Sequence, residues 1–348
     1  MLVLNDLFRD FRVWSRNGTS SLRHGNYWQE HFAMTVYMIF YLFIFIVVGF
    51  FGNLLIIAAV TTNQRLQTSG NVYIINLAIA DLGVTLLVDG NNIAGVLFGH
   101  KIYIELELEW LCYLCGYLCG VFCFTSAFSL AAIALDRLFF LCHNNFYRKY
   151  YSTTTTVCMC LVIWSCSFVL CFPMIFGWFN CSIVFDDKVM LCFWDRLAGF
   201  WCSVFNMGCF ILPIIIVFVA YSRIFLFVWR SKRELNTFSA PGSVANRMGG
   251  GKADDTATRL AKTFFIIFII FVIMWLPWSV MNIVDMTNRY PKWMVLIFLN
   301  LGHANSAVNS LLYGATNRMF REAYKDILLC KLLNKKRNVR KHNPSTTR

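Results

Sequence analysis

Long uninterrupted runs of apolar residues, separated by short polar stretches, make up most of this chain. Seven of the runs reach the roughly 20 residues that an α-helix needs to cross a bilayer. We predict spans at residues 35–60, 71–98, 111–141, 155–178, 200–228, 260–283 and 293–315. The short alternating segments of a transmembrane barrel do not occur. The pattern therefore predicts an all-α membrane protein, a seven-transmembrane helix bundle.

A short amphipathic helix is predicted after the seventh run, because Phe320, Tyr324, Ile327 and Leu328 fall on one face of a basic segment. Cys330 follows it, at a position suited to palmitoylation. The predicted organisation is an extracellular N-terminal segment (1–34), the bundle (35–315), a cytoplasmic amphipathic helix (316–331) and a basic cytoplasmic tail (332–348).

Composition and charge agree with a membrane protein and set its orientation. The chain is 58% hydrophobic and 14% charged, whereas soluble domains are about a quarter charged. The net charge of +13 collects in the tail and in the loops after spans one, three and five, while acidic residues follow spans two, four and six. The positive-inside rule thus predicts a multi-pass plasma-membrane protein with an outer N-terminus and an inner C-terminus, and explains the charge without nucleic acid.

Cysteine and asparagine patterns add candidate modifications. The fourteen cysteines are scattered, and no pair recurs with zinc-ligand spacing, so we expect neither a disulfide framework nor a zinc site. Cys112 and Cys192 both fall on the outer side, where a disulfide can persist, and we predict that they pair; Cys181 competes for either partner. Asn17 and Asn180 each begin an N-glycosylation pattern.

Polar residues inside the spans must face the bundle interior, since lipid would leave them without partners. Asp81, Ser126, Asn305 and Asn309 are such residues. One carboxylate among hydroxyls and carboxamides offers the oxygen ligands that a small cation prefers. The sequence therefore predicts a sodium-and-water cluster or an ordinary interhelical hydrogen-bond network, two interpretations that are compatible.

An acid–base dipeptide, Asp136 and Arg137, ends the third span at the inner membrane edge. It indicates either a charged latch or a snorkelling arginine whose neighbour offsets its charge. Pro213 and Pro277 fall inside the fifth and sixth spans, where each removes a backbone donor and favours a kink or a hinge.

These features together resemble the rhodopsin-like G-protein-coupled receptors over about residues 35–330. The resemblance is carried in order by Gly52, Asn53, Asp81, Cys112, Asp136, Arg137, Trp164, Pro213, Tyr221, Phe271, Trp275, Pro277, Asn309, Tyr313 and Phe320. Within the family the chain is similar to melatonin-type receptors at Leu141, Cys142, His143, Tyr147, Lys149, Tyr151 and Ser152, and at residues 320–324.

The resemblance implies a receptor that binds an extracellular ligand and activates a heterotrimeric G protein. Its switch residues would be Asp136, Arg137, Tyr221, Phe271, Trp275, Pro277, Asn309 and Tyr313, and its ligand site would be lined by Cys119, Phe122, Cys123, Met207, Trp278, Asn282 and His303. At rest Asp136 would restrain Arg137, and activation would release this arginine as the sixth span swings outward.

Departures from the family pattern limit the classes of ligand that we expect. Cys119 stands where amine receptors carry an aspartate, and His303 stands where opsins carry the retinal lysine, so neither a monoamine nor retinal is expected. The histidine that melatonin receptors carry in span five falls at Cys209, and Ser310 replaces the usual proline after Asn309. A hydrophobic small molecule or a peptide remains.

Three other classes are less consistent with the sequence. A seven-span ligand-gated channel or chemosensory subunit would need the opposite orientation, and a transporter should show internal repeats, which we do not find. No nucleophile–base or metal-ligand set is recognisable in the spans, so we expect no enzyme and no cofactor beyond a sodium ion.

Overall fold

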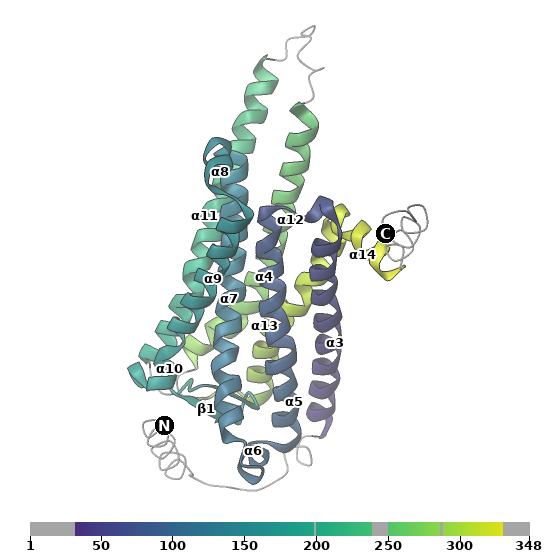
Figure 1. The fold of residues 1–348 in the computed structure, drawn as a ribbon. Coiled ribbons are helices and arrows are strands. Elements are labelled where there is room, and N and C mark those ends of the chain that lie inside the picture. The colour runs from purple at the N-terminus through teal and green to yellow at the C-terminus, as the bar shows by residue number, and fades with distance from the viewer. Residues whose placement is uncertain (1–31, 198–199, 239–249, 286–287, 330–348) are drawn as a thin grey trace, which may run out of the picture.

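A computed structural model describes residues 32–197, 200–238, 250–285 and 288–329. Within these ranges seven helices are long and apolar enough to cross a membrane, which confirms the predicted bundle (Figure 1). Asn17, Cys330 and the basic tail lie outside the described residues, so glycosylation at Asn17 and palmitoylation at Cys330 remain predictions.

The spanning segments follow the predicted order. They are α3 (Phe32–Thr62), α4 with α5 (Ser69–Gly83 and Asp89–Phe98), α7 (Glu109–Cys142), α9 with α10 (Thr153–Leu170 and Phe172–Phe176), α11 (Phe200–Phe238), α12 (Gly250–Val284) and α13 (Lys292–Thr316). The connections hold α6 (Lys101–Glu105), α8 (Asn144–Tyr150) and 3-10 turns at Gln64–Leu66 and Trp178–Asn180, and α14 (Arg318–Leu328) follows α13.

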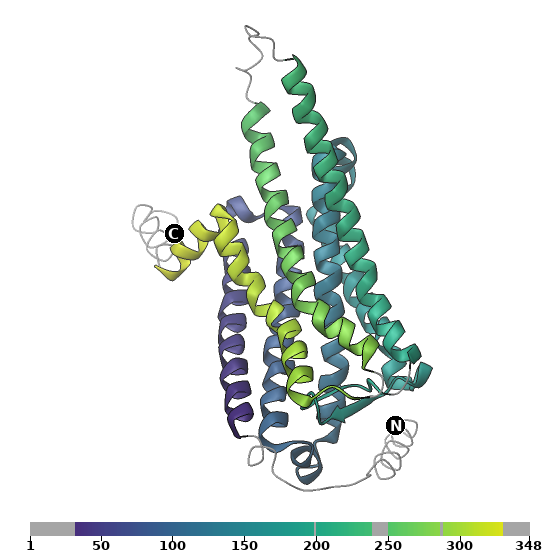
Figure 2. The same ribbon diagram turned by 180° about the vertical axis from the view of Figure 1, so that it is seen from behind.

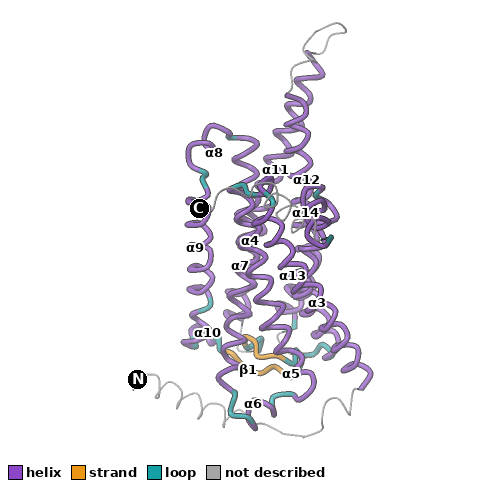
Figure 3. The backbone as a smooth tube through the Cα atoms, turned by 45° about the vertical axis from the view of Figure 1, so that its right-hand side comes forward, coloured by secondary structure: helices purple, strands orange, loops and turns teal. Residues whose placement is uncertain are grey.

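Helix α7 is the centre of the bundle. It packs against α4, α9, α11 and α12, and at one end against the strand β2 (Leu191–Trp194). Figures 1 and 3 show α7 running between α4 and α9. Helix α3 packs on α4, α5 and α13 at the other side of the bundle. The helix that carries Asp136 and Arg137 therefore contacts most of the other spanning helices.

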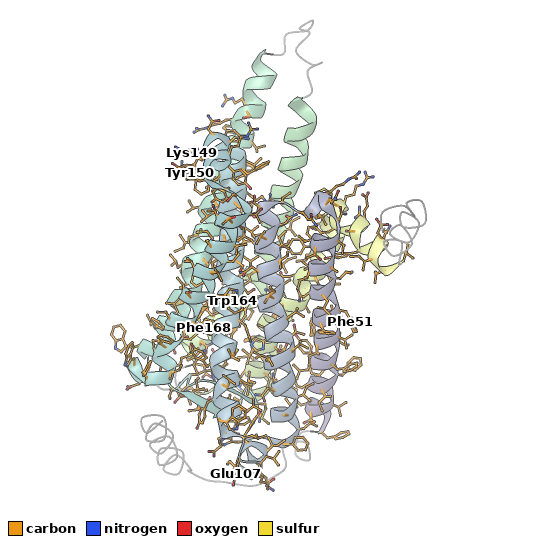
Figure 4. The ribbon with its side chains drawn as sticks, viewed as in Figure 1. Phe51, Glu107, Lys149, Tyr150, Trp164 and Phe168 are labelled. Atoms are coloured by element: carbon orange, nitrogen blue, oxygen red, sulfur yellow. A yellow bond between two sulfur atoms is a disulfide. The ribbon has the colours of Figure 1, made fainter. Side chains whose placement is uncertain are left out.

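Apolar side chains cover the outside of the bundle. On α3, Phe40, Phe43 and Phe51 are more than half exposed, while Asn53 on the same helix is fully buried. Figure 4 shows Phe51 pointing away from the other helices. An apolar outer face with polar groups turned inward is the arrangement that a hydrocarbon solvent requires.

A π-helical turn at Val84–Val88 interrupts the second span. Asp81 lies just before it and Asp89 just after it, and both are buried. In an unbroken α-helix, two positions eight residues apart point about 80° away from each other. The wider i→i+5 turn offsets part of this angle, so both carboxylates face the interior.

A two-stranded antiparallel hairpin, β1 (Ile183–Asp186) with β2, lies between α10 and α11. The sequence analysis did not predict it, because four-residue strands in a loop leave too little alternation to detect. Cys192 in β2 is bonded to Cys112 at the start of α7, as predicted. Cys181 does not compete for Cys112; it pairs instead with Cys202 in the first turn of α11.

The two ends of the bundle differ. The hairpin and α6 lie at one end, and α8 and α14 lie at the other (Figures 1 and 3). At the α8 end, α11 and α12 project past the remaining helices, and α14 turns aside from the bundle (Figure 2). Phe320 of α14 is buried against Tyr313, with ring centroids 5.2 Å apart, so α14 is held to the end of α13.

The pairing of the two disulfides predicts which cysteine variants should share the same melting temperature. The bonds close loops of 80 and 21 residues, for which the loop-entropy model gives about 4.5 and about 3 kcal/mol. We expect the double change Cys181→Ala with Cys202→Ala to lower the melting temperature no further than Cys181→Ala alone. Differential scanning fluorimetry of the purified protein measures this.

The cross-pair change Cys181→Ala with Cys192→Ala serves as the control, and it should be additive because it opens both bonds. A cross-pair variant no worse than a single variant would mean that the pairing is wrong.

Candidate functional site

The carboxylate of Asp81 is the centre of a buried polar cluster between α4, α7 and α13. Its Oδ1 accepts a hydrogen bond from Ser126 Oγ at 3.1 Å, and its Oδ2 accepts one from Asn309 Nδ2 at 2.8 Å. Ser306 also interacts with the carboxylate. The structure thus brings together Asp81, Ser126 and Asn309, three members of the predicted sodium set.

Asn305, the fourth member, is buried one helical turn before Asn309, but its Oδ1 has no partner among the described residues. Ser306 takes the place near Asp81 that the sequence analysis gave to Asn305. The reason is geometric, since residues 305 and 306 point about 100° apart around the helix.

Hydrogen bonds extend this cluster across the bundle. Asn53 Nδ2 donates to the backbone oxygen of Ser306 at 3.0 Å, which ties α3 to α13. Asn76 donates to Ser129 Oγ at 2.8 Å and accepts from Trp164 Nε1 at 2.9 Å, which ties α4 to α7 and α9. We name the side chains of Asn53, Asn76, Asp81, Ser126, Ser129, Ser306 and Asn309 the polar seam.

Asp136 and Arg137 lie near the end of α7 that is followed by α8. Arg137 Nη1 is 3.6 Å from Asp136 Oδ2, and Nη2 lies 3.5 Å from Asn71 Oδ1. Asp136 is fully buried and lies against Gly70 of α4, where an added Cβ would clash with the carboxylate, so the absence of a side chain at position 70 makes this close approach possible. The dipeptide is therefore packed into the bundle rather than extended toward solvent.

Tyr147 also contacts Asp136, a contact that the sequence analysis did not predict. From α8, its hydroxyl donates to Asp136 Oδ1 at 3.1 Å and lies 3.2 Å from Ser69 Oγ. Burial raises the pKa of Tyr147, so the hydroxyl keeps its proton and remains a donor at neutral pH. The eleven-residue separation between the partners gave no periodic signal in the sequence.

Two tryptophans of α12, Trp275 and Trp278, occupy the half of the interior that is nearer the hairpin. Trp275 stacks on Phe210 of α11 with ring centroids 5.2 Å apart, and the His303 ring lies 6.2 Å from it. Gly302 makes this approach possible, because a Cβ there would meet the Trp275 ring at 3.0 Å. One turn before, Phe271 lies 6.3 Å from Trp275, and Pro277 lies inside the same helix.

The predicted ligand-site residues do not all share one face. Trp278 is fully buried and meets Phe193 of β2 edge-on at 5.6 Å, and Asn282 donates to the Trp278 carbonyl. Met207 on α11 is also buried. Phe122, however, packs against Gly83 and Trp164, between α7, α4 and α9, so the structure does not bring it together with the others.

A buried acid–base pair lies in the same half of the interior. The sequence analysis named its base, His303, but not its acid, Asp89. Asp89 Oδ1 is 3.0 Å from His303 Nδ1, and both residues are almost fully buried. On its other side, His303 Nε2 is 3.8 Å from Cys119 Sγ. Asp89 lies beyond the π-helical turn, which changes the helical register, and its partner is 214 residues away.

A clamp of charged residues holds the hairpin over this end of the bundle. Arg196 Nε is 2.7 Å from Asp186 Oδ2, and its Nη1 is 4.0 Å from Asp285 Oδ2 just after α12. Lys188 Nζ donates to the carbonyls of Asn288 and Tyr290, and burial lowers its pKa despite the nearby Asp285. The hairpin is thus tied to the segment between α12 and α13.

Comparison with known proteins identifies the class to which this architecture belongs. A sequence model of the family described as "7 transmembrane receptor (rhodopsin family)" matches residues 52–313 of the chain. The match covers more than half of the chain, so the protein belongs to the rhodopsin family of seven-transmembrane receptors, which is a receptor family and not an enzyme family.

Individual relatives agree with that assignment. The chain is 28% identical over 297 residues to the melatonin receptor type 1A of Mus musculus, covering 83% of this chain and 79% of that protein. It is 26% identical to the melatonin receptor type 1C of Xenopus laevis, covering 85% of this chain and 67% of that one. The crystal structure of squid rhodopsin has a similar fold, with a TM-score of 0.69 at 21% identity over 90% of this chain and 92% of that chain.

The clamp predicts a measurable stability difference. Arg196→Gln leaves Asp186 and Asp285 without their shared cation, and unpairing buried charges from one side costs about 3–5 kcal/mol. We expect a melting temperature clearly below that of the unaltered protein.

Lys101→Gln is the matched control. It breaks a pair with Glu105 in which both side chains are 59% exposed, and such pairs contribute under about 1 kcal/mol. If the two variants melted at the same temperature, Arg196 would have no role in fastening the hairpin.

Proposed function

We propose that the protein is a plasma-membrane receptor that binds a hydrophobic small molecule on its outer side and activates a heterotrimeric G protein on its inner side. The observation that carries the proposal is the packed arrangement of Asp136, Arg137 and Tyr147 at the inner end of α7. The proposed organisation places the N-terminal segment outside and α14 and the basic tail inside.

Charge distribution supports this orientation. Arg148 and Lys149 lie on α8, at the same end of the bundle as α14 (Figure 3). The opposite end carries the hairpin with Asp186 and the adjoining Asp285. A positive inner side is the usual arrangement in multi-pass proteins, and disulfides such as those of the hairpin persist on the outer side.

The outer half of the bundle supports a small ligand rather than a peptide. Strand β2 is buried along its whole length, and Arg196 ties the hairpin to Asp285, so the outer end is covered. The interior beneath is formed by Met207, Trp278 and the thiols of α7. Asn282 Oδ1 is buried and has no partner among the described residues, which makes it a candidate acceptor for a ligand donor.

The similar proteins are named as melatonin receptors, and that likeness is strongest here at inner and structural positions. Cys119, Cys209 and His303 differ from what the family pattern carries at the ligand-facing positions. We therefore propose a hydrophobic ligand for this chain without assigning it melatonin. Asn180, which is exposed beside the hairpin, remains our proposed second glycosylation position.

The mechanism follows from a two-state bundle that a ligand biases. At rest, Asp136 accepts from Tyr147 and pairs with Arg137, which holds the guanidinium against α4. A ligand that moves Trp275 displaces α12 about Pro277, because the ring is packed between Phe210 and Gly302. The inner end then opens, and the freed guanidinium can bond several acceptors of a G protein at once.

A sodium ion at Asp81 would act on the same equilibrium. The carboxylate has two hydroxyl or amide neighbours at hydrogen-bond distance, and the unpartnered Asn305 Oδ1 lies on the adjacent turn of α13. An ion that binds the resting arrangement better than the open one must disfavour activation by linkage. We propose that sodium stabilises the resting state in this way.

The latch is tested by signalling normalised to the number of receptors at the cell surface. Asp136→Asn removes the charge that holds Arg137, and hydrogen bonds to charged groups contribute about 1.5–3 kcal/mol, so basal signalling should rise by at least about tenfold. Tyr147→Phe removes one donor and should give a rise of about threefold. Arg137→Ala should abolish signalling while leaving surface delivery intact.

Tyr150→Phe is the control, because Tyr150 lies on the same helix and is exposed. A panel of G proteins should be used, read by nucleotide exchange. Unchanged normalised signalling in Asp136→Asn and Arg137→Ala would refute the latch and leave only a membrane-anchoring role for the dipeptide.

A further inference from the structure

Three potential metal ligands meet in the outer half of the bundle. Cys119 and Cys123 are four residues apart on α7 and therefore share one face. His303 faces them from α13, and the two Sγ atoms and a ring nitrogen of His303 all lie within 4.8 Å of one another. All three residues are buried, and among the described residues no other such group occurs.

Asp89 supplies a second, independent observation. Its carboxylate lies 3.0 Å from His303 Nδ1, so the proton of the neutral imidazole belongs on Nδ1, donated to Asp89. The lone pair of Nε2 then points toward Cys119 Sγ, 3.8 Å away. A carboxylate that holds the far nitrogen and leaves the near one free is the usual support of a metal-binding histidine.

We propose that Cys119, Cys123 and His303 bind a zinc ion. In a tetrahedral site with Zn–S near 2.3 Å and Zn–N near 2.0 Å, ligand atoms lie about 3.5–3.8 Å apart, close to the Cys119–His303 separation. Binding as a bis-thiolate releases the two thiol protons to solvent and changes no oxidation state. Three protein ligands leave the fourth position for water or for a donor atom of a ligand.

The sequence analysis expected no zinc site, because it looked for cysteines at the local spacings of zinc motifs. Here the thiols lie one helical turn apart and the histidine is 180 residues further along the chain. The site is about 10 Å below the disulfide at Cys112, counted as seven residues along α7. A bound ion would link α7 to α13 within the region proposed for the ligand.

The inference adds to the proposed function at the same residues, but its test does not depend on signalling. The full-length receptor is purified in detergent, stripped with chelator, and given zinc or cobalt(II) alone. We expect one zinc per chain by elemental analysis, and a thiolate-to-cobalt charge-transfer band with cobalt. Absence of the band from the unaltered protein would overturn the proposal, as would binding of copper(I) but not zinc.

Variants locate the ion. Cys119→Ser, Cys123→Ser and His303→Gln should each lose the zinc, and Asp89→Asn should weaken it by about 10–100-fold. Cys115→Ser is the matched control, since Cys115 is a buried, free thiol one turn away on α7. Zinc retained by all the variants would place the ion elsewhere and overturn the assignment.

The melting temperature of each metal-free variant shows whether that variant is folded. If a variant does not fold, the cobalt band of the unaltered protein decides whether the proposal holds. A receptor that binds zinc but activates no G protein would contradict only the proposed function, whereas a receptor that activates a G protein but binds no zinc would contradict only this inference.

Discussion

Hydrocarbon offers no hydrogen-bonding partner, so every polar side chain within the membrane must find one inside the protein. Asp81 imposes this requirement most strongly, because a carboxylate there can reach neither water nor a base. In the polar seam, Ser126 and Asn309 donate hydrogen bonds to the carboxylate. Hydrogen bonds of the Asn53 and Asn76 side chains extend the seam to α3 and α9. The outer faces of the same helices are apolar, as Phe51 on α3 illustrates.

The same constraint acts at three depths along α7. In the first half of α7, Cys119 lies against His303, whose partner is Asp89. Seven residues further along the helix, Ser126 donates a hydrogen bond to Asp81. Ten residues beyond Ser126, Asp136 accepts a hydrogen bond from Tyr147. Each carboxylate has at least one partner on an element other than its own helix, so a shift of α7 against its neighbours alters contacts at more than one of these sites. This shared helix offers a physical basis for the coupling that we propose between a ligand and a G protein, and double-mutant cycles measure the size of that coupling.

Sequence patterns were sufficient where one helix determines the outcome. The number and order of the spans and the inward position of Asp81 followed from run length and burial cost alone. The pairing of Asp89 with His303, the clamp of Arg196 and the bond between Cys181 and Cys202 did not, because each depends on which distant segments come together. The π-helical turn at Val84–Val88 also displaces Asp89 from the register that a regular helix predicts. Phe122 packs against Trp164, away from the other predicted ligand-site residues, because neighbouring positions on α7 face different helices.

We propose that the Asp81 cluster is an ion-responsive junction of the resting bundle. It is tested most directly by the melting temperature of the purified receptor in sodium chloride and in choline chloride at equal ionic strength. The account predicts that sodium stabilises the unaltered protein, by about 2.7 kcal/mol when its concentration is 100 times the dissociation constant, and leaves Asp81→Asn unaffected. An equal sodium shift in both proteins, or none in the unaltered one, would contradict it.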